Sequence, residues 1–277
     1  AGLVRTERSS ELLFSHMSYL ADIGVDYFAA GKSLPGGAYL GLSVKALSVG
    51  EIPVTTELLP DGTGETTSPT FLVVGAAFSR KMSDQIAVGV AANVVYEKMA
   101  EVSTTGIAFT GGVQYARLGG IEGLSVGVVI RNIGPKLVYD GEGLERTGII
   151  IGADRPETNY KVEAASADLP STIEVGLGYL HRVGEPVEIA LSTLFRNNNF
   201  SDDEYKFGAE FGYRGRFFLR GGYDYSTESE GNESIFGPAF GVGVHESVQN
   251  MAIRVDYAYR TASYFGGNHI VTLTVGF

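Results

Sequence analysis

Apolar and polar side chains alternate with a period of two along most of this chain, in one segment of about ten residues after another. In the segment 205–213 the odd positions carry Tyr, Phe or Ala, and the even positions carry Lys, Glu or Gly. Successive side chains of a β-strand point to opposite faces of its sheet, so this pattern predicts strands with one apolar and one polar face. About fourteen strands and no amphipathic helix are predicted. The expected spans are 11–20, 22–31, 38–48, 70–80, 85–98, 104–117, 123–133, 171–182, 186–196, 204–214, 216–226, 238–247, 250–261 and 268–277.

The composition narrows the class of protein that these strands can build. The 277 residues include 38 Gly but neither Cys nor Trp, the charged fraction is 19%, and the formal net charge is −11. Without Cys the chain has no disulfide and no thiolate site. An acidic balance argues against nucleic-acid binding, which needs clustered cations. No apolar run approaches the roughly 18 residues of a membrane helix, so a helical membrane protein is excluded.

The connections between the expected strands alternate between tight and long. Every second link is a tight turn, whereas most of the others are longer and more acidic, and two are very long, 49–69 and 134–170. Outer-membrane barrels show this asymmetry, with short periplasmic turns and longer extracellular loops. A soluble sandwich has no reason to sort its loops in this way.

Aromatic residues of the apolar faces fall at the two expected rims, where amphipathic rings meet the lipid headgroups. The chain also ends on an aromatic residue, Phe277. These features favour one all-β domain over residues 1–277, a transmembrane antiparallel up-and-down β-barrel in the bacterial outer membrane. The alternative is a soluble sandwich or lipocalin-like barrel with its apolar faces inward. The expected outer-rim residues are Tyr96, Phe195, Tyr205, Tyr225 and Tyr259, and the inner-rim residues are Phe78, Tyr115, Tyr179, Tyr213, Phe217 and Phe277.

Several short motifs resemble the PorV/PorQ family of outer-membrane proteins, relatives of the FadL fatty-acid transporters. The most specific are Ser15-His16 followed by Leu20-Ala21-Asp22-Ile23, the run Asn132-Ile133-Gly134-Pro135-Lys136-Leu137, and Asp256-Tyr257-Ala258-Tyr259. The resemblance implies a 14-stranded FadL-like barrel. It also implies, for some members, a role in type IX protein secretion, in which extracellular loops capture exported proteins. In that family Ala-Gly-Leu follows Asn-Pro and a Gly/Ala-rich hatch that folds inside the barrel, and that stretch is missing ahead of Ala1 here.

Twelve charged residues fall on the polar faces and are expected to line the lumen as a network of cross-strand ion pairs. The network either fills and rigidifies the barrel or forms a conduit. Few large apolar residues are expected inward, namely Phe28, Leu47, Val129, Leu180, Leu194 and Phe218, which argues against a greasy tunnel. The expected lumen charges are Lys45, Glu97, Arg131, Glu174, Glu188, Arg196, Lys206, Glu210, Arg220, Asp224, Arg254 and Asp256.

The motifs that suggest catalysis or metal binding are weak, so we expect no enzyme, cofactor or metal site. Gly123-Leu124-Ser125-Val126-Gly127 matches the G-x-S-x-G pattern of hydrolases, but Ser125 lies inside an alternating strand with no helix after it. The four His residues are dispersed and lack metal-ligand spacing. The run Asp202-Asp203-Glu204 is interpreted as a solvated acidic loop, with weak Ca²⁺ binding as the alternative.

The two long loops are the expected functional surface, because links of this size are usually binding elements or disordered. Each carries an apolar piece, Leu58-Leu59 in one and Ile149-Ile150-Ile151 in the other. These pieces indicate either a protein partner or strand extensions above the membrane. The leading hypothesis is a non-enzymatic barrel that contacts the lipid bilayer and binds protein partners in secretion or surface assembly, with no nucleic-acid partner. The alternatives are a FadL-like transporter of hydrophobic or small solutes and a structural subunit of a surface layer.

Overall fold

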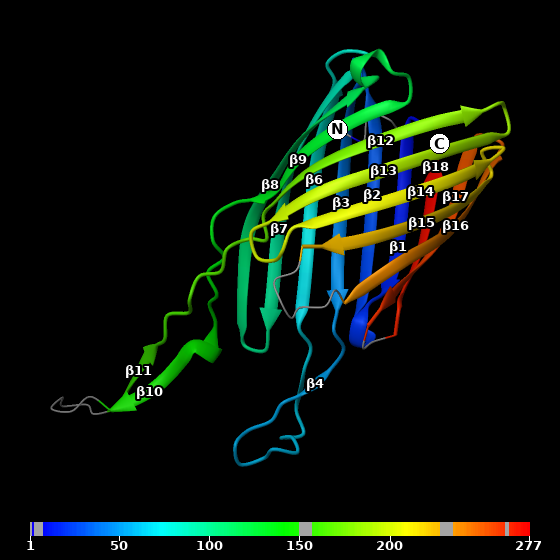
Figure 1. The fold of residues 1–277 in the computed structure, drawn as a ribbon. Coiled ribbons are helices and arrows are strands. Elements are labelled where there is room, and N and C mark those ends of the chain that lie inside the picture. Colours follow the sequence, from blue (N-terminus) through cyan, green and yellow to red (C-terminus); the bar gives the residue numbers. More distant parts are fainter. Residues whose placement is uncertain (1, 3–7, 150–156, 228–234, 264–265) are drawn as a thin grey trace.

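The protein folds into a closed antiparallel barrel of fourteen strands (Figure 1). The structure, a computed structural model, describes residues 2, 8–149, 157–227, 235–263 and 266–277. The barrel strands follow one another round the wall in chain order, and β1 closes the barrel by pairing with β18. They are β1 (Ser10–Ser18), β2 (Gly24–Leu34), β3 (Ala38–Ser48), β6 (Thr70–Lys81), β7 (Ile86–Met99), β8 (Val102–Ala116), β9 (Leu124–Ile133), β12 (Thr172–Val183), β13 (Val187–Asn198), β14 (Glu204–Tyr213), β15 (Phe217–Ser226), β16 (Phe236–Val248), β17 (Met251–Ala262) and β18 (Asn268–Gly276).

Two small hairpins stand outside the barrel sheet. One pairs β4 (Ile52–Pro53) with β5 (Thr66–Thr67), and the other pairs β10 (Glu145–Ile149) with β11 (Glu157–Lys161). The described residues also form three short 3-10 turns, η2 (Leu20–Asp22), η3 (Leu118–Gly120) and η4 (Glu142–Leu144). No helix in the described part of the chain has the length and apolar character needed to cross a membrane.

The apolar face of the strands points outward. Leu42, Val90 and Phe207 are 56%, 62% and 52% exposed, and each lies mid-strand among polar or small neighbours of the opposite face. Only seven hydrophobic residues in the described ranges are buried, and three of them are Ala. A soluble barrel would bury its large apolar residues in a central core, so the soluble alternative is excluded. The exposed apolar belt belongs to an outer-membrane protein.

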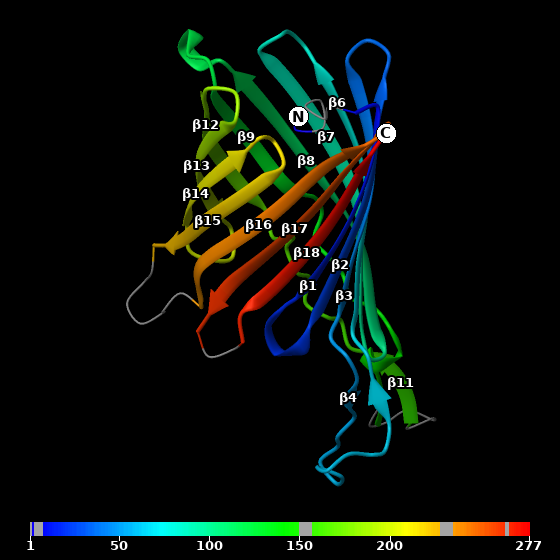
Figure 2. The same cartoon turned by 90° about the vertical axis from the view of Figure 1, so that its right-hand side faces the viewer.

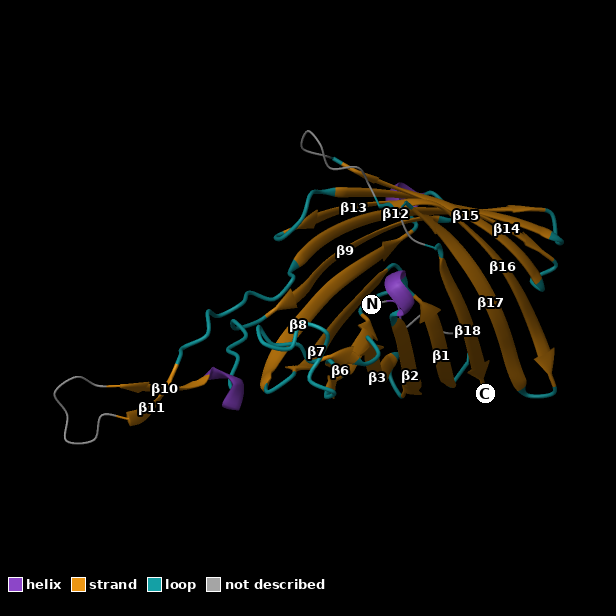
Figure 3. Ribbon diagram, turned by 90° about the horizontal axis from the view of Figure 1, so that it is seen from below, coloured by secondary structure: helices purple, strands orange, loops and turns teal. Residues whose placement is uncertain are grey.

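The long and short connections are sorted to opposite ends, as predicted. Figures 1 and 2 show the β4 region and the β10–β11 hairpin projecting from one end, while the β2–β3 and β6–β7 turns and the C-terminus lie toward the other. Seen from the long-loop end, the β10–β11 hairpin extends sideways beyond the barrel wall (Figure 3). By the usual asymmetry of outer-membrane barrels, the long-loop end is extracellular and the tight-turn end periplasmic.

The prediction of about fourteen strands is confirmed, and the differences are local. The first strand ends at Ser18 rather than at residue 20, because Ala21 takes a left-handed φ of 53° in the turn η2. The second strand runs on to Leu34, since the turn is made by Pro35, Gly36 and Gly37. Loops 49–69 and 134–170 contain the two hairpins. The apolar run 149–151 of the second loop therefore begins at the end of a strand, β10. Ile150 and Ile151 lie outside the described residues.

Candidate functional site

All twelve expected lumen charges lie on the inner face of the barrel. Strand register carries this face from strand to strand: Glu174 of β12 is level with Arg196 of β13, and Lys206 of β14 is level with Asp224 of β15. Within each strand the alternate residues face lipid. Ten of the twelve gather on one side of the lumen, on the inner face of β9 and β12–β17, which we call the charged wall.

Seven charges of the charged wall form a continuous chain of ion pairs. It contains four cations and three carboxylates in strict alternation, so an arginine stands at each end. Its most buried member is Glu174, whose side chain is 4% exposed and accepts hydrogen bonds from two arginines. The successive N–O distances are Arg131–Glu174 3.2 Å, Glu174–Arg196 2.9 Å, Arg196–Glu204 3.2 Å, Glu204–Lys206 2.7 Å, Lys206–Asp224 3.4 Å and Asp224–Arg260 3.7 Å.

A second cluster centres on Arg220. Its guanidinium lies 2.5 Å from Glu210 and 2.5 Å from Asp256, and it also covers the ring of Phe218. The imidazole of His245 contacts the ring of Phe218 at a tilt, with ring centroids 4.1 Å apart, and lies 3.4 Å from Asp256. Each charge therefore has opposite charges or rings around it, as a half-buried polar network requires.

The remaining expected lumen residues are held separately. Arg254 lies 3.8 Å from Glu11, and Glu188 lies 3.9 Å from Arg182; neither of these partners belongs to the chain of seven. Glu97 accepts a hydrogen bond of 2.6 Å from Tyr139. Lys45 forms no ion pair with any residue that the structure describes.

Sequence reasoning missed two members of the chain of ion pairs, Glu204 and Arg260. Glu204 was assigned to a solvated acidic loop, but it starts β14 and contacts Arg196 and Lys206. The signal was present, because Glu204 has the same strand parity as Lys206 and Glu210. Arg260 likewise shares the parity of Arg254 and Asp256.

The opposite side of the lumen is built from small and apolar residues. This small wall is the inner face of β2, β3, β6, β7 and β8, and among its described residues only Lys45, Lys81 and Glu97 are charged. The expected inward position of Phe28 is wrong: Phe28 is level with Phe14 and Val44 on the lipid-facing side and is 46% exposed. The small and apolar inward residues of this wall are Val25, Ala29, Gly31, Gly41, Leu47, Phe71, Val73, Gly75, Ala77, Ala87, Gly89, Ala91, Val95, Gly106, Ala108 and Gly112.

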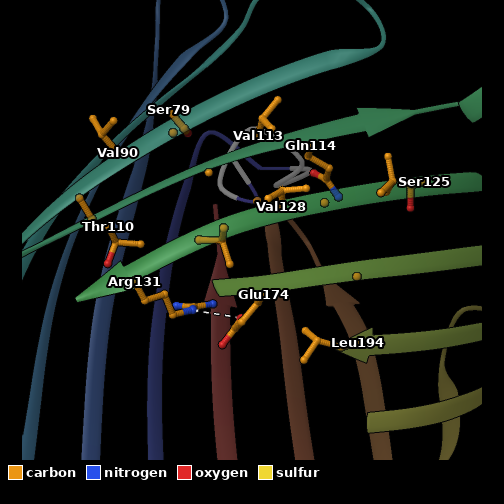
Figure 4. A pocket seen from close by; sticks show the side chains of 18 of the residues that line it. Ser79, Val90, Thr110, Val113, Gln114, Ser125, Val128, Arg131, Glu174 and Leu194 are labelled. Carbon is orange, nitrogen blue, oxygen red and sulfur yellow. Dashed lines mark hydrogen bonds and ion pairs between the residues drawn. The ribbon is translucent and has the colours of Figure 1, made fainter. Parts of the chain in front are cut away.

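A cavity of about 530 Å³ lies in the lumen where the two walls meet. Its lining is largely small and apolar, and includes Ala77, Ala91 and Gly112 from the small wall and Leu194 from the charged wall. Figure 4 shows Arg131 and Glu174 directed toward each other on one side of the cavity, across from Ser79 and Gln114. The cavity thus offers an apolar surface with a few polar groups, the usual character of a small-molecule site.

The base of the loop 134–170 folds into the extracellular mouth and packs on the small wall. Leu137 and Leu169 are 4% and 5% exposed and cluster with Ala108 of β8. Backbone bonds fix the two segments, because Leu137 and Ala167 exchange hydrogen bonds at 2.7 and 2.9 Å. The loop therefore covers part of the mouth beside β7 and β8.

Residues 132–137 direct the backbone from the end of β9 into the mouth of the barrel. Asn132 takes a left-handed φ of 56°, and its side-chain amide donates to the carbonyl of Pro170 at 2.9 Å. Gly134 passes so close to β8 that a Cβ would collide with the carbonyl of Ile107. The most specific motif of the family resemblance thus positions Leu137 in the mouth.

Polar contacts also hold the loop 134–170 in place, and they shift the pKa values of two of its residues. The bond to Glu97 raises the pKa of Tyr139 to about 12, and burial adds to the shift. The ion pair with Lys161 lowers the pKa of Asp140, with help from the backbone N–H of Gly141. The loop base is therefore held by directional polar contacts as well as by the apolar cluster.

The serine of the G-x-S-x-G match is part of a barrel strand. Ser125 lies in β9 and donates its hydroxyl to the carbonyl of Gly178 at 3.3 Å. In the described ranges no three His, Cys, Asp or Glu residues are grouped as metal ligands.

The apolar residues of the first long loop are exposed. Leu58 is 90% and Leu59 52% exposed, beside the turn closed by Thr56. Ile149 ends β10 in the second loop.

Comparisons with known proteins give the fold. No protein-family model and no curated protein matches this chain. The monoaromatic hydrocarbon channel CymD has a TM-score of 0.59 at 10% identity, covering 99% of this chain and 91% of that one. The toluene transporter TodX of Pseudomonas putida has a TM-score of 0.58 at 11% identity, covering 100% and 92%. A FadL homologue of Pseudomonas aeruginosa has a TM-score of 0.54 at 10% identity, covering 99% and 91%. The chain therefore has the fold of FadL-like outer-membrane barrels, and the narrower PorV/PorQ resemblance is not addressed by these matches.

Proposed function

We propose that this protein is an outer-membrane channel for small hydrophobic solutes. The observation that carries the proposal is the lumen cavity of about 530 Å³, in a barrel whose small wall lines it with Gly and Ala. Small residues give the lumen an apolar lining and leave it open. A prediction that counts only large inward apolar residues does not detect such a lining. The similar structures CymD and TodX are described as a hydrocarbon channel and a toluene transporter, which supports the same class of solute.

The charged wall serves a structural role in this proposal. Its ion pairs hold β9 and β12–β17 together across the lumen face, and alternating signs keep the net charge of the chain of seven at one positive charge. An apolar solute would pass along the small wall, where no ion pair has to be broken.

The proposal is tested by uptake of radiolabelled toluene into cells that carry the barrel in their outer membrane and lack other hydrocarbon channels. We expect toluene uptake to rise over cells without the barrel, and uptake of a trisaccharide to stay unchanged. Ala91→Phe places a ring in the cavity and should abolish the gain, whereas Ala92→Phe, on the lipid-facing side of the same strand, should retain it. Equal toluene uptake with and without the barrel would refute the proposal.

A second candidate function is the protein-binding adaptor that the PorV/PorQ resemblance implies. The observation in its favour is the pair Leu58 and Leu59, exposed on an extracellular loop that also carries Glu51, Glu57 and Asp61. Cross-linking in native membranes should then yield a defined partner that Leu58→Ser/Leu59→Ser loses. Recovery of the barrel alone would count against this function while leaving the channel untouched.

A further inference from the structure

Two cations stand on the lipid-facing side of the barrel at its periplasmic end. Lys32 lies two residues before the end of β2, and Arg80 lies one residue before the end of β6. Lys32 is level with Leu40 of β3, and Arg80 is level with Ala38 of the same strand. The two cations therefore flank β3, with backbone positions about 12 Å apart from strand spacing and rise.

The surface between and beyond these cations is apolar. Leu40 and Phe78 share the outward face, level with Lys32 and one level further into the membrane than Arg80, and are 46% and 42% exposed. Leu34, 37% exposed, adjoins Lys32 at the rim. Arg80 lies at the rim above these apolar side chains, and the long side chain of Lys32 can extend to the same rim, which matches the order of headgroup and acyl chain in a lipid leaflet.

Neither cation is neutralised by a residue that the structure describes. In the described residues Lys32 and Arg80 form no ion pair, although Asp84 lies in the turn that follows β6. Elsewhere on the same rim Arg216 pairs with Glu246 and Arg182 with Glu188. The chain has a net charge of −11, so two neighbouring cations without an ion pair among the described residues stand out against its acidic balance.

We infer that Lys32 and Arg80 bind the phosphate group of an anionic phospholipid in the periplasmic leaflet. Arginine contacts phosphate oxygens through two parallel N–H donors, and lysine adds a point charge. The acyl chains lie against Leu40 and Phe78. The interaction is independent of the lumen, so it stands whether or not the channel proposal holds.

Native mass spectrometry of the intact barrel in mild detergent tests the inference, with cardiolipin as the anionic probe and phosphatidylethanolamine as the zwitterionic one. Each basic residue contributes about a fivefold preference for an anionic surface, so cardiolipin should bind Lys32→Gln/Arg80→Gln about 25-fold more weakly than the wild type. The matched control Arg182→Gln/Arg216→Gln removes the same charge from the same end and should bind as the wild type does. Lys32→Arg/Arg80→Lys should also retain binding.

Equal affinity of the wild type for the two lipids would overturn the inference without any variant. An equal loss in the control variant would also overturn it, because it would reduce the effect to total charge at the rim. Heat-modifiable migration in SDS gels reports whether each variant folds. If the double variant does not fold, Lys32→Gln alone should still show the fivefold loss, and unchanged binding would refute the site.

Discussion

At the scale of single residues, Glu174 has the most demanding position in the lumen. Its side chain is 4% exposed and lies between Arg131 and Arg196, which are 50% and 30% exposed. Removing its charge leaves Arg131 and Arg196 with one fewer counter-ion. Breaking a buried ion pair in this way lowers the free energy of unfolding by more than an exposed pair contributes to it.

Glu174→Gln should therefore lower the free energy of unfolding by about 2 kcal/mol. Glu188→Gln is the control, because Glu188 is 29% exposed and lies 3.9 Å from an arginine that is 73% exposed; its cost should stay below about 0.5 kcal/mol. Urea titrations followed by far-UV circular dichroism suit a chain without Trp. Equal losses would show that the chain of ion pairs contributes no more than isolated pairs do.

Tyr139 gives a pH-dependent prediction. Its pKa of about 12 lies above the ordinary tyrosine value of 10.0, chiefly because its hydroxyl donates to Glu97. The raised pKa means that the folded state holds the proton more tightly, so this contribution to stability is complete below about pH 10 and is lost as the pH rises through 12.

The difference in absorbance at 295 nm between wild type and Tyr139→Phe should show one ionisation near pH 12. Glu97→Gln removes the charged acceptor and should move that ionisation back toward 10, the ordinary value. An unchanged ionisation in Glu97→Gln would show that burial, and not the hydrogen bond, sets the pKa.

The inward or outward position of a residue could be predicted from strand parity, but the choice of ion-pair partner could not. Parity placed Glu174 and Arg196 on one face, while their contact depends on the register that brings β12 and β13 level. Phe28 was misplaced because Tyr27 beside it is also aromatic, so the alternation is ambiguous there. Its neighbours Asp26 and Ala30 share its outward face.

At the scale of elements, the fit of the loop 134–170 into the mouth depends on β8. Gly106 faces Leu137 so closely that a Cβ would collide with it. Gly111, further along the strand, has open space where its Cβ would lie. The sequence predicted a long exposed loop here, because no local pattern reveals that Leu137 and Leu169 return to the small wall.

Gly106→Val should leave the barrel folded but release the loop base. Trypsin should then cut faster at Lys136 and Lys161, by about tenfold if docking loses about 1.4 kcal/mol. Gly111→Ala is the control and should be cut at the wild-type rate. Faster cleavage in both variants would mean that glycine flexibility, rather than the contact with Leu137, governs the loop.

At the scale of the whole molecule, two faces of one wall meet different solvents. The outer face carries Leu, Val, Phe and Tyr at exposures near 40–60%, and the inner face carries the charges. A β-barrel satisfies its backbone within the sheet, so only the side chains distinguish lipid from water. The same substitution on adjacent residues should therefore have different costs.

Leu191 and Ser192 provide this comparison near the middle of β13. Leu191 faces lipid and is 52% exposed, while Ser192 faces the lumen, level with Gly178 and Gly208 of the neighbouring strands. Arginine near the bilayer midplane of a barrel costs about 2–4 kcal/mol on the lipid face.

Leu191→Arg should thus lower the free energy of unfolding in lipid vesicles by this amount. Ser192→Arg should lower it by less than about 1 kcal/mol, because its guanidinium reaches water and the carboxylates of the charged wall. A larger cost for Ser192→Arg than for Leu191→Arg in vesicles would place lipid on the wrong side of the wall, and the channel and the phospholipid site would both have to be abandoned.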